Sequence, residues 1–504
     1  MLVRIRFEDS QSKDILVNDD SRWWDATQMA RAIADGEVSS AEMVDASIAR
    51  IEAEDEEYNS VTLRWFEHAG DLAQGPLGDG PFAGVPFLLK DLWVQYAGQG
   101  RTDGNVALAA APPISTVDSV LVTRFKAAGL ITVGRSASPE MGTIPATEST
   151  AHGDTRNPWN TDRSPAGSSG GAAAAVAAGF VPIAHASDGG GSIRLPASCC
   201  GLVGLKPSQG RISMQGHGIE TGLGVDFCVS RSVRDSATML DALQGPGVGD
   251  SIIAPDPTQP YIDAIELPPS RLRIGILDSH PMGGFLHSEC AVAVRNTATA
   301  LEAMGHHIEQ SFPATMSDAS FVPRFMAMWA AGRRAGLANM SKAIGRALTE
   351  DEVEPQNWVQ AVHADNMSAW EYCDALAAVA EYRRATHQWW ADGWDLLVSP
   401  VMAEPPVEIG EFIAQPGAPL AGLMRAGEVC PYTPPFNTSG QPAISLPLHW
   451  SSDGLPVGVQ IVAAYGREDL LLAIAAQLEH ALPWADRRPP VPNVATVRLD
   501  DQAI

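Results

Sequence analysis

The amino-acid sequence predicts one large α/β domain, and three observations support that fold class. Short apolar segments typical of buried strands alternate with segments of helical periodicity along most of the 504 residues. Hydrophobic residues make up 45% of the chain and charged residues 19%, which is typical of a soluble globular protein. The sequence contains no internal repeat and no low-complexity linker at which to divide it. We therefore expect an N-terminal extension at residues 1–20, followed by a single domain over residues 21–504.

The first half of the chain is predicted to hold a helix, a strand and a helix–strand unit. The helix is expected to start at Ser39, because Glu42 three residues later completes a capping box. The segment PFAGVPFLLKDLWV (81–94) is short, apolar and bounded by proline, so it predicts a buried strand that carries Lys90. The segment at 119–136 predicts a helix that leads into a β-branched strand.

The second half contains strands on either side of a helical region. The segments LRIGILDS (272–279) and DLLVSP (395–400) predict buried strands. A helical insertion rich in Trp, Met and Ala is expected near residues 320–390. Residues 440–465 predict two strands joined by the turn SSDG, and residues 467–482 predict a final amphipathic helix.

Charge and hydropathy exclude several classes of protein. The formal net charge of −26 repels phosphate backbones, so we expect no nucleic-acid binding. The longest uncharged apolar stretch (171–184) is short, and a glycine and a proline interrupt it, so no membrane span is expected. The first residues lack the apolar core of a signal peptide, which favours a cytoplasmic location.

The cysteine and histidine patterns predict no metal site. The six cysteines include no C-x-x-C pair, and the twelve histidines form no H-E-x-x-H motif. We therefore expect no metal or other cofactor.

Two serine-containing segments are candidates for a nucleophile. AGSSGG (166–171) formally matches the G-x-S-x-G elbow of α/β-hydrolases with Ser169 as the nucleophile, but the preceding residues RNPWNTDRSP are not a strand. SDGGGSIRLP (187–196) places three glycines before Ser192, where backbone N–H groups could form an oxyanion hole. Taken alone, each segment is also compatible with a flexible surface turn.

A nucleophilic serine needs a base, and Lys90 is the strongest candidate. Leu88, Leu89 and Leu92 surround it, and burial lowers the pKa of a lysine towards the range in which it accepts protons. The alternative is a lysine that extends to solvent from an edge strand. No histidine has a spacing that singles it out, and His185 in its apolar run is expected to be structural.

Four segments together resemble the amidase signature family. They are GVPFLLKD (84–91), SPAGSSGGAAAAVAAGFVP (164–182), SDGGGSIRLPASCCGLVGLKPSQGRIS (187–213) and PFNTSGQPAISLPL (435–448). The resemblance covers roughly residues 22–490. It implies an amidase-signature fold, a large mixed β-sheet covered by helices on both faces, and hydrolysis of carboxylic amides through an acyl-enzyme.

The resemblance also assigns roles to particular residues. It implies a Ser–cis-Ser–Lys triad of Ser192 as nucleophile, Ser168 as the cis-serine and Lys90 as base. The oxyanion hole is expected to be formed by the backbone amides of Gly189, Gly190, Gly191 and Ser192. Asp188 and Arg194 flank this loop and are expected to support it as an ion pair.

Within the family, the sequence is most similar to the 6-aminohexanoate cyclic dimer hydrolase branch, which implies oligoamide or aliphatic and aryl amide substrates. Hydrolysis of carbamates by the same triad is the alternative. Family analogy suggests Met141, Gly142 and Thr143 as substrate-binding residues. Met328 and Trp329 are candidates for an acyl wall or lid, although such a helix is also typical of plain core. The expected partner is a small molecule, and a homodimer is one option for the assembly.

The sequence departs from the family pattern at three places. Ala166 stands where a glycine is usual, Gly189 stands where a larger residue is common, and the loop at 96–108 lacks a Thr-Thr-x-Gly-Ser pattern. None of these changes removes a catalytic group. Three further readings stay open: an amidotransferase subunit, which the acidic charge disfavours, a binding protein without catalysis, and a metal-dependent amidohydrolase. The cysteine and histidine patterns disfavour the last of these, which would be sensitive to a chelator.

Overall fold

One mixed sheet of 11 strands forms the centre of the computed structural model, which describes residues 19–218 and 222–491. Residues 1–18 of the expected N-terminal extension lie outside the described residues. The strands of the sheet are, in chain order, β1 (Val61–Arg64), β2 (Pro86–Lys90), β3 (Ile131–Ser136), β6 (Ile183–Asp188), β7 (Val203–Lys206), β8 (Val225–Ser230), β9 (Arg273–Ile276), β10 (His307–Gln310), β11 (Leu396–Pro400), β12 (Ala443–Trp450) and β13 (Pro456–Ala463). A separate two-stranded sheet joins β4 (Glu148–Ser149) and β5 (Gly153–Asp154).

The spatial order of the strands is β1-β3-β2-β6-β8-β7-β12-β13-β11-β9-β10. Strand β2 is parallel to its neighbours β3 and β6, and β9 is parallel to β10 and β11. The other pairs are antiparallel, which makes the sheet mixed, as the sequence resemblance implies. Strands β12 and β13, from the end of the chain, join the half of the sheet built by the first 230 residues to β11, β9 and β10.

Helices cover both faces of this sheet. Every residue of β2, β3 and β13 is buried, and successive side chains of a strand point to opposite faces, so both faces must be covered. The helices are α1 (Ala26–Ala34), α2 (Ser40–Tyr58), α3 (Phe66–Gln74), α4 (Val106–Ala110), α5 (Val120–Ala127), α6 (Gly170–Ala177), α7 (Arg194–Cys200), α8 (Val233–Leu243), α9 (Tyr261–Ala264), α10 (Ser288–Ala303), α11 (Val322–Ile344), α12 (Pro355–Asp365), α13 (Ala369–Ala391), α14 (Ala421–Val429), α15 (Pro434–Ser439) and α16 (Glu468–Ala481).

The structure confirms several helices and strands that local sequence signals predict. Ser39 Oγ accepts a hydrogen bond from the backbone N–H of Glu42, whose carboxylate accepts the N–H of Ser39, so the capping box starts α2. The segment predicted as a strand with one lysine is β2, and the predicted pair of strands at 440–465 is the β12–β13 hairpin. The segment at 272–279 forms a strand only over Arg273–Ile276, which is shorter than predicted.

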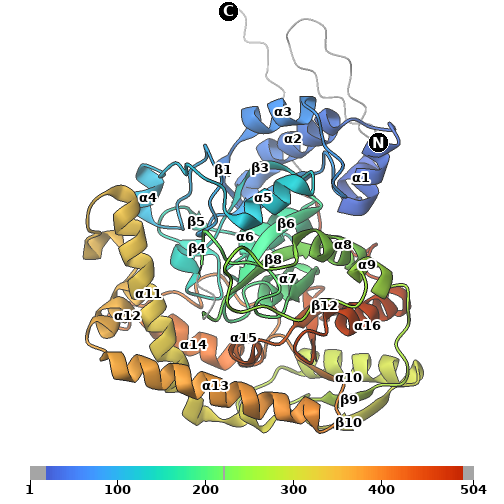
Figure 1. Ribbon diagram of the computed structural model, residues 1–504, viewed down its shortest axis with the longest axis vertical. Coiled ribbons are helices and arrows are strands. Elements are labelled where there is room, and N and C mark those ends of the chain that lie inside the picture. The colour runs from blue at the N-terminus through green and yellow to red at the C-terminus, as the bar shows by residue number, and fades with distance from the viewer. Residues whose placement is uncertain (1–18, 219–221, 492–504) are drawn as a thin grey trace, which may run out of the picture.

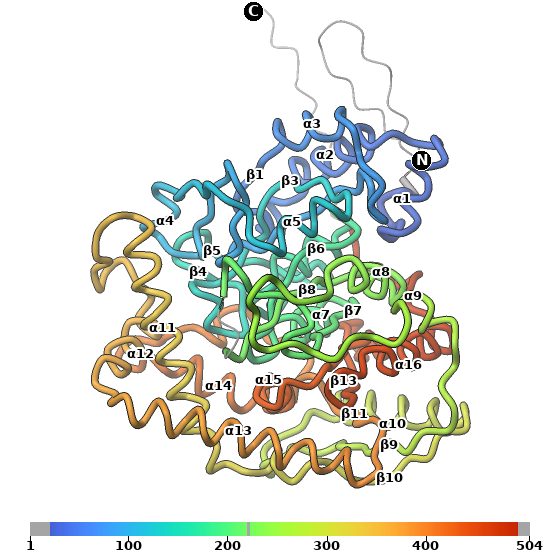
Figure 2. The backbone as a smooth tube through the Cα atoms, in the orientation of Figure 1, coloured from blue at the N-terminus to red at the C-terminus, as the bar shows by residue number. Residues whose placement is uncertain are grey.

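The region near 320–390 is helical, as predicted. Figure 1 shows α11, α12 and α13 (yellow to orange) along the left and lower sides of the molecule. Helix α11 packs against both α12 and α13, and α13 packs against α15, which Figure 2 shows beside it. No helix in the described ranges is long and apolar enough to cross a membrane.

Candidate active site

Three segments bring the predicted catalytic residues to one edge of the sheet. Lys90 is the last residue of β2, Ser168 lies in the loop before α6, and Ser192 lies in the loop between β6 and α7. Strands β2 and β6 are parallel neighbours, so their carboxyl ends lie side by side. The order of the strands therefore places the end of β2 next to the loop that follows β6.

Lys90 and Ser168 form a hydrogen-bonded pair in the interior. The Lys90 Nζ lies 2.8 Å from Ser168 Oγ and 2.9 Å from Ser187 Oγ. Lys90 has no solvent exposure and Ser168 is only 2% exposed. The peptide bond between Gly167 and Ser168 is cis, as the family resemblance implies.

The environment of Lys90 favours a neutral amine. Burial lowers the pKa of Lys90 to about 7, and the negative charges of Asp226 and Asp188 oppose part of that shift. The direction agrees with the prediction from the three neighbouring leucines. A large fraction of the side chain is therefore unprotonated at neutral pH and able to accept a proton.

His185 supports the backbone of Lys90 and does not contact Ser192. Its Nδ1 accepts a hydrogen bond from the Lys90 backbone N–H at 3.2 Å, and its Nε2 lies 3.0 Å from Asp226. Burial lowers the pKa of His185, so the ring is neutral and its Nε2–H donates to the carboxylate. This histidine is structural, as the sequence predicts.

Ser192 is half-buried and faces a cavity together with Gly190. Lys90 reaches Ser168, but Ser192 Oγ forms no hydrogen bond with a side chain in the described part of the protein. The three candidate triad residues are thus gathered at one site, with only the lysine–serine contact formed. Ser169, the alternative nucleophile, is fully buried and exchanges hydrogen bonds with the Ser187 backbone, which removes it from the cavity.

The glycines before Ser192 differ in whether a side chain would fit at their positions. Gly191 has φ +138°, and a Cβ there would lie 2.9 Å from Leu195 and overlap the hydroxyl of Thr433, so only glycine fits. No heavy atom lies within 4 Å of a Cβ built at Gly190. The backbone N–H of Gly191 donates to Asp188 Oδ1 at 2.7 Å, so it is occupied within the protein. The N–H groups of Gly189, Gly190 and Ser192 are the remaining candidates for an oxyanion hole.

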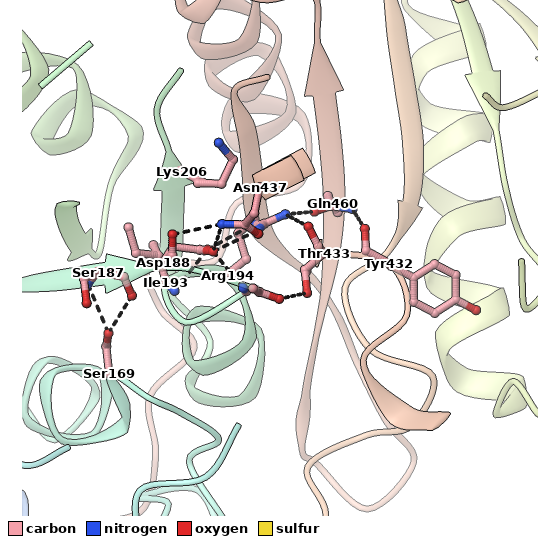
Figure 3. A network of polar contacts seen from close by, with 12 residues as sticks. Ser169, Ser187, Asp188, Ile193, Arg194, Lys206, Tyr432, Thr433, Asn437 and Gln460 are labelled. Carbon is pink, nitrogen blue, oxygen red and sulfur yellow. Dashed lines mark hydrogen bonds and ion pairs between the residues drawn. The ribbon is translucent and has the colours of Figure 1, made fainter. Parts of the chain in front are cut away.

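Asp188 and Arg194 form the predicted ion pair beneath this loop. Figure 3 shows Arg194 donating to both oxygens of Asp188, with Nε–Oδ2 and Nη2–Oδ1 distances of 2.9 Å. Both residues have no solvent exposure. Burial alone would raise the pKa of Asp188, but the Arg194 guanidinium outweighs it and holds the pKa well below its usual range.

Residues from the end of the chain complete this network. Arg194 also donates to the Thr433 backbone carbonyl at 3.0 Å and to Gln460 Oε1 at 2.7 Å. Asn437 accepts from Arg194 at 2.6 Å and donates to Asp188 Oδ1 at 2.9 Å. The loop that carries Ser192 is therefore fixed by segments about 240 residues further along the chain (Figure 3).

A cavity of about 550 Å³ opens in front of Ser192. Its walls come from the loop that holds Gly142 and Thr143, from α11, from α14 and from α15. Most of the wall is apolar, and its large side chains include Met282, Met316, Phe321, Phe325, Met326, Trp329, Tyr382, Leu423 and Met424. Asp318 and Glu428 are the charged residues of this wall, and no basic residue of the described chain lines it. The cavity thus suits neutral or cationic apolar molecules better than anions.

The suggested substrate-binding residues divide into two groups. Gly142, Thr143 and Trp329 line the cavity. Met141 and Met328 do not line it: Met141 is 1% exposed and packs in an apolar cluster, and Met328 is 8% exposed. Most of the remaining wall was not foreseeable, because the α14 sequence AGLMRAGEV contains no pattern that distinguishes a cavity wall from a core face.

Sequence comparisons with known proteins match this chain to amide hydrolases. A family model described as Amidase matches residues 42–472. The chain is 43% identical to the 6-aminohexanoate-cyclic-dimer hydrolases of Pseudomonas sp. (strain NK87) and Paenarthrobacter ureafaciens, and each alignment covers 94% of this chain and 97% of the relative.

Solved structures give the same result. The structure of a 6-aminohexanoate cyclic dimer hydrolase matches with a TM-score of 0.90 and 42% identity, over 93% of this chain and 99% of the other. A bacterial aryl acylamidase of the amidase signature family matches with a TM-score of 0.81 and 26% identity, over 92% and 97% of the two chains.

Proposed function

Because this chain belongs to the amidase signature family, whose members hydrolyse amide C–N bonds, we propose that it acts through a Ser192–Ser168–Lys90 triad and an acyl-enzyme. The single observation that carries this proposal is the 2.8 Å hydrogen bond between Lys90 Nζ and Ser168 Oγ. A buried lysine whose pKa is about 7, bonded to a serine beside a cavity that holds a second serine, has the parts of a proton relay.

The proposed reaction begins with proton transfer along the relay. Neutral Lys90 takes a proton from Ser168, which takes one from Ser192, and Ser192 Oγ attacks the substrate carbonyl carbon. The negative oxygen is stabilised by backbone N–H groups from Gly189, Gly190 and Ser192. The relay requires a hydrogen bond between Ser168 and Ser192, and catalytic hydrogen bonds of this kind commonly tighten only in the complex with substrate.

The second half of the reaction regenerates the enzyme. Ser168 delivers a proton to the leaving nitrogen as the C–N bond breaks, which leaves the acyl group as an ester on Ser192. Water then attacks this ester and gives a proton to the same relay. The bond between Ser192 Oγ and the acyl carbon breaks, the relay returns the proton to Ser192 Oγ, and the carboxylic acid leaves. Lys90 and Ser168 thus act first as base and then as acid in each half.

The cavity wall supports a neutral and largely apolar substrate. Two relatives at 43% identity are named as 6-aminohexanoate-cyclic-dimer hydrolases, and a cyclic amide of that type carries no net charge. We propose cyclic or linear oligoamides, or aliphatic and aryl amides, as the substrate class. The acidic residues Asp318 and Glu428 disfavour substrates that end in a carboxylate near them.

A carbamate is the second candidate substrate. The alkoxy oxygen of a carbamate stands where an amide has a carbon next to the carbonyl and is no larger, so a cavity that accepts the amide has room for the carbamate as well. The same relay would attack the carbamate carbonyl without any change of residues.

A labelling experiment tests the nucleophile. A fluorophosphonate probe, followed by peptide mass spectrometry, is expected to label Ser192, and the variant S192A is expected to lose both the label and amide hydrolysis. The variant S169A is the matched control, because it removes the neighbouring candidate hydroxyl that lies outside the cavity. Turnover retained by S192A, or a label on Ser169, contradicts the proposal.

A substrate panel then separates the two classes. The panel contains cyclic and linear aminohexanoate oligomers, an anilide, a fatty amide and a small dicarbamate. Higher kcat/KM for the neutral cyclic amide than for its carboxylate-bearing linear form supports the oligoamide assignment. Preference for the dicarbamate over every amide replaces that assignment and leaves the triad unaffected.

A further inference from the structure

Helix α11 contacts both sides of the candidate catalytic centre through two residues. Trp329 and Arg333 are four positions apart, so they lie on one face of the helix. The Arg333 Cζ lies 4.7 Å from the centroid of the Trp329 ring, within the range of a cation–π contact. Both side chains are half-buried, and this face of α11 points to the loops around Ser168 and Ser192.

The hydrogen bonds of Arg333 all go to one turn. Its Nη1 donates to the Met141 backbone carbonyl at 2.7 Å and to Thr143 Oγ1 at 3.0 Å. The Nε atom is buried without a partner, and the guanidinium forms no ion pair within the described residues. Burial lowers the pKa of Arg333 to about 10, so it remains a cation at neutral pH. The negative charge of Glu140 opposes part of that shift, and the two hydrogen bonds to the turn account for the position of this half-buried side chain.

The turn that Arg333 holds has a conformation that needs support. Met141 has φ +53°, a left-handed backbone that long side chains rarely adopt. Such residues persist where surrounding contacts enforce them. Gly142 follows at φ +64°, and a Cβ built there would lie 3.1 Å from Ser168 Oγ. The turn thus lies directly against the serine that bonds to Lys90.

Trp329 connects the same helix to the opposite side of the site. Its ring lines the cavity, and a methyl group at position 189 would lie 3.5 Å from its Cζ3 atom, which is ordinary van der Waals contact. The glycine at 189 therefore leaves space between the oxyanion loop and the tryptophan ring. One helix face thus contacts the turn against Ser168 through Arg333 and faces the loop of Ser192 through Trp329.

We propose that Arg333 is a positioning residue that, with Trp329, fixes the turn at Met141–Thr143 against Ser168 and so sets the geometry of the proton relay. This inference rests on the proposed triad, since it names a residue that acts through Ser168. Arg333 touches no reacting atom and does not line the cavity.

Hydrogen bonds at Glu140 also hold this turn, so removal of the Arg333 side chain is expected to have a local effect. Glu140, just before the turn, accepts hydrogen bonds from Asn105 at 2.7 Å and from Asn357 at 2.6 Å. These bonds hold the start of the turn to α12 and to the loop before α4, and they remain when the two hydrogen bonds of Arg333 are removed. A variant at 333 is therefore expected to fold with the turn altered mainly at Met141 and Gly142.

The test compares two neighbouring arginines of α11. The variant R333M removes both bonds and keeps the length of the side chain, and R334M makes the same change at an exposed arginine that pairs with Asp365. We expect kcat of R333M to fall about 10²-fold with little change in KM, as a displaced relay requires. The rate of fluorophosphonate labelling at Ser192 should fall in parallel, and R334M should leave both rates within a factor of about two.

A conservative variant and a structure complete the test. R333K keeps the cation with fewer donors, so an intermediate loss of about tenfold is expected, and it replaces R333M should that variant fail to fold. Unchanged kcat in a folded R333M or R333K, or an equal loss in R334M, overturns the inference.

A crystal structure of R333M tests the inference without an activity assay. Movement of Met141 out of the left-handed region, with Gly142 displaced from Ser168, supports it, and an unchanged turn overturns it. Failure of the proposed function looks different, because the unsubstituted protein would then leave Ser192 unlabelled and amides intact.

Discussion

The kcat/KM is expected to fall about 50-fold between pH 7 and pH 5, because the relay needs a neutral Lys90. Burial lowers the pKa of Lys90 to about 7. At pH 5 the neutral fraction is then about 1%, at pH 7 about half and at pH 8 about 90%. The sign follows from the role: the base works when it is unprotonated, so activity is present above the pKa and is lost as the pH falls through it.

The assay is a profile of kcat/KM against pH for an uncharged amide at constant ionic strength. An uncharged substrate contributes no ionisation of its own, so the acidic limb reports the free enzyme. The variant K90M is expected to lose about 10²–10⁴-fold in kcat/KM at pH 8 and to lose the limb centred near 7.

Lys206 offers a matched control for this experiment. It ends β7 in the same sheet, has no solvent exposure, and burial lowers its pKa to about 7 as well. Its Nζ donates to the Pro207 carbonyl and it does not line the cavity, so K206M should keep the limb. A limb that survives in K90M, or that disappears in K206M, refutes the assignment of Lys90 as base.

Two further predictions concern the loop that carries Ser192. G191A introduces a side chain at φ +138° against Leu195, so we expect the free energy of unfolding to fall by about 1–3 kcal/mol and fluorophosphonate labelling to be lost. The methyl group of G190A points into open space, so this variant should keep the melting temperature of the unsubstituted protein. Equal melting temperatures for the two variants would count against this reasoning. D188N leaves Arg194 as a buried cation without its counter-charge, so urea unfolding should show a loss of about 3–5 kcal/mol, and a loss below about 1 kcal/mol would contradict a supporting role for the pair.

Local signals in the sequence were sufficient for several elements and for the candidate base. The capping box at Ser39 and the leucines around Lys90 act within a few residues of themselves, so their effects survive in the fold. The β12–β13 hairpin was predictable for the same reason, because its two strands and the turn between them are adjacent in the sequence. Lys90 and Ser168, which the family resemblance assigned, also lie together, and Ser192 faces the cavity beside them.

Other features of the fold and of the candidate site depend on contacts between segments that are distant in the sequence. The short edge strand β10 is half exposed and forms by pairing with β9, which no local pattern specified. Met141 was a candidate for the cavity wall, but the left-handed turn directs its side chain into the core and leaves Gly142 at the site. The use of the Gly191 N–H by Asp188 likewise follows from loop geometry and is invisible in the sequence SDGGGS.

The network around Arg194 has a consequence for biosynthesis. A ribosome has made all three candidate catalytic residues once it has passed Ser192, but Thr433, Asn437 and Gln460 emerge far later. Until then Arg194 lacks three of its partners, and β7 lacks its neighbour β12 in the sheet. The nascent chain therefore contains a complete set of reactive groups without the framework that orients them. Hydrolytic competence is expected to arrive only as the last part of the protein is translated and docks.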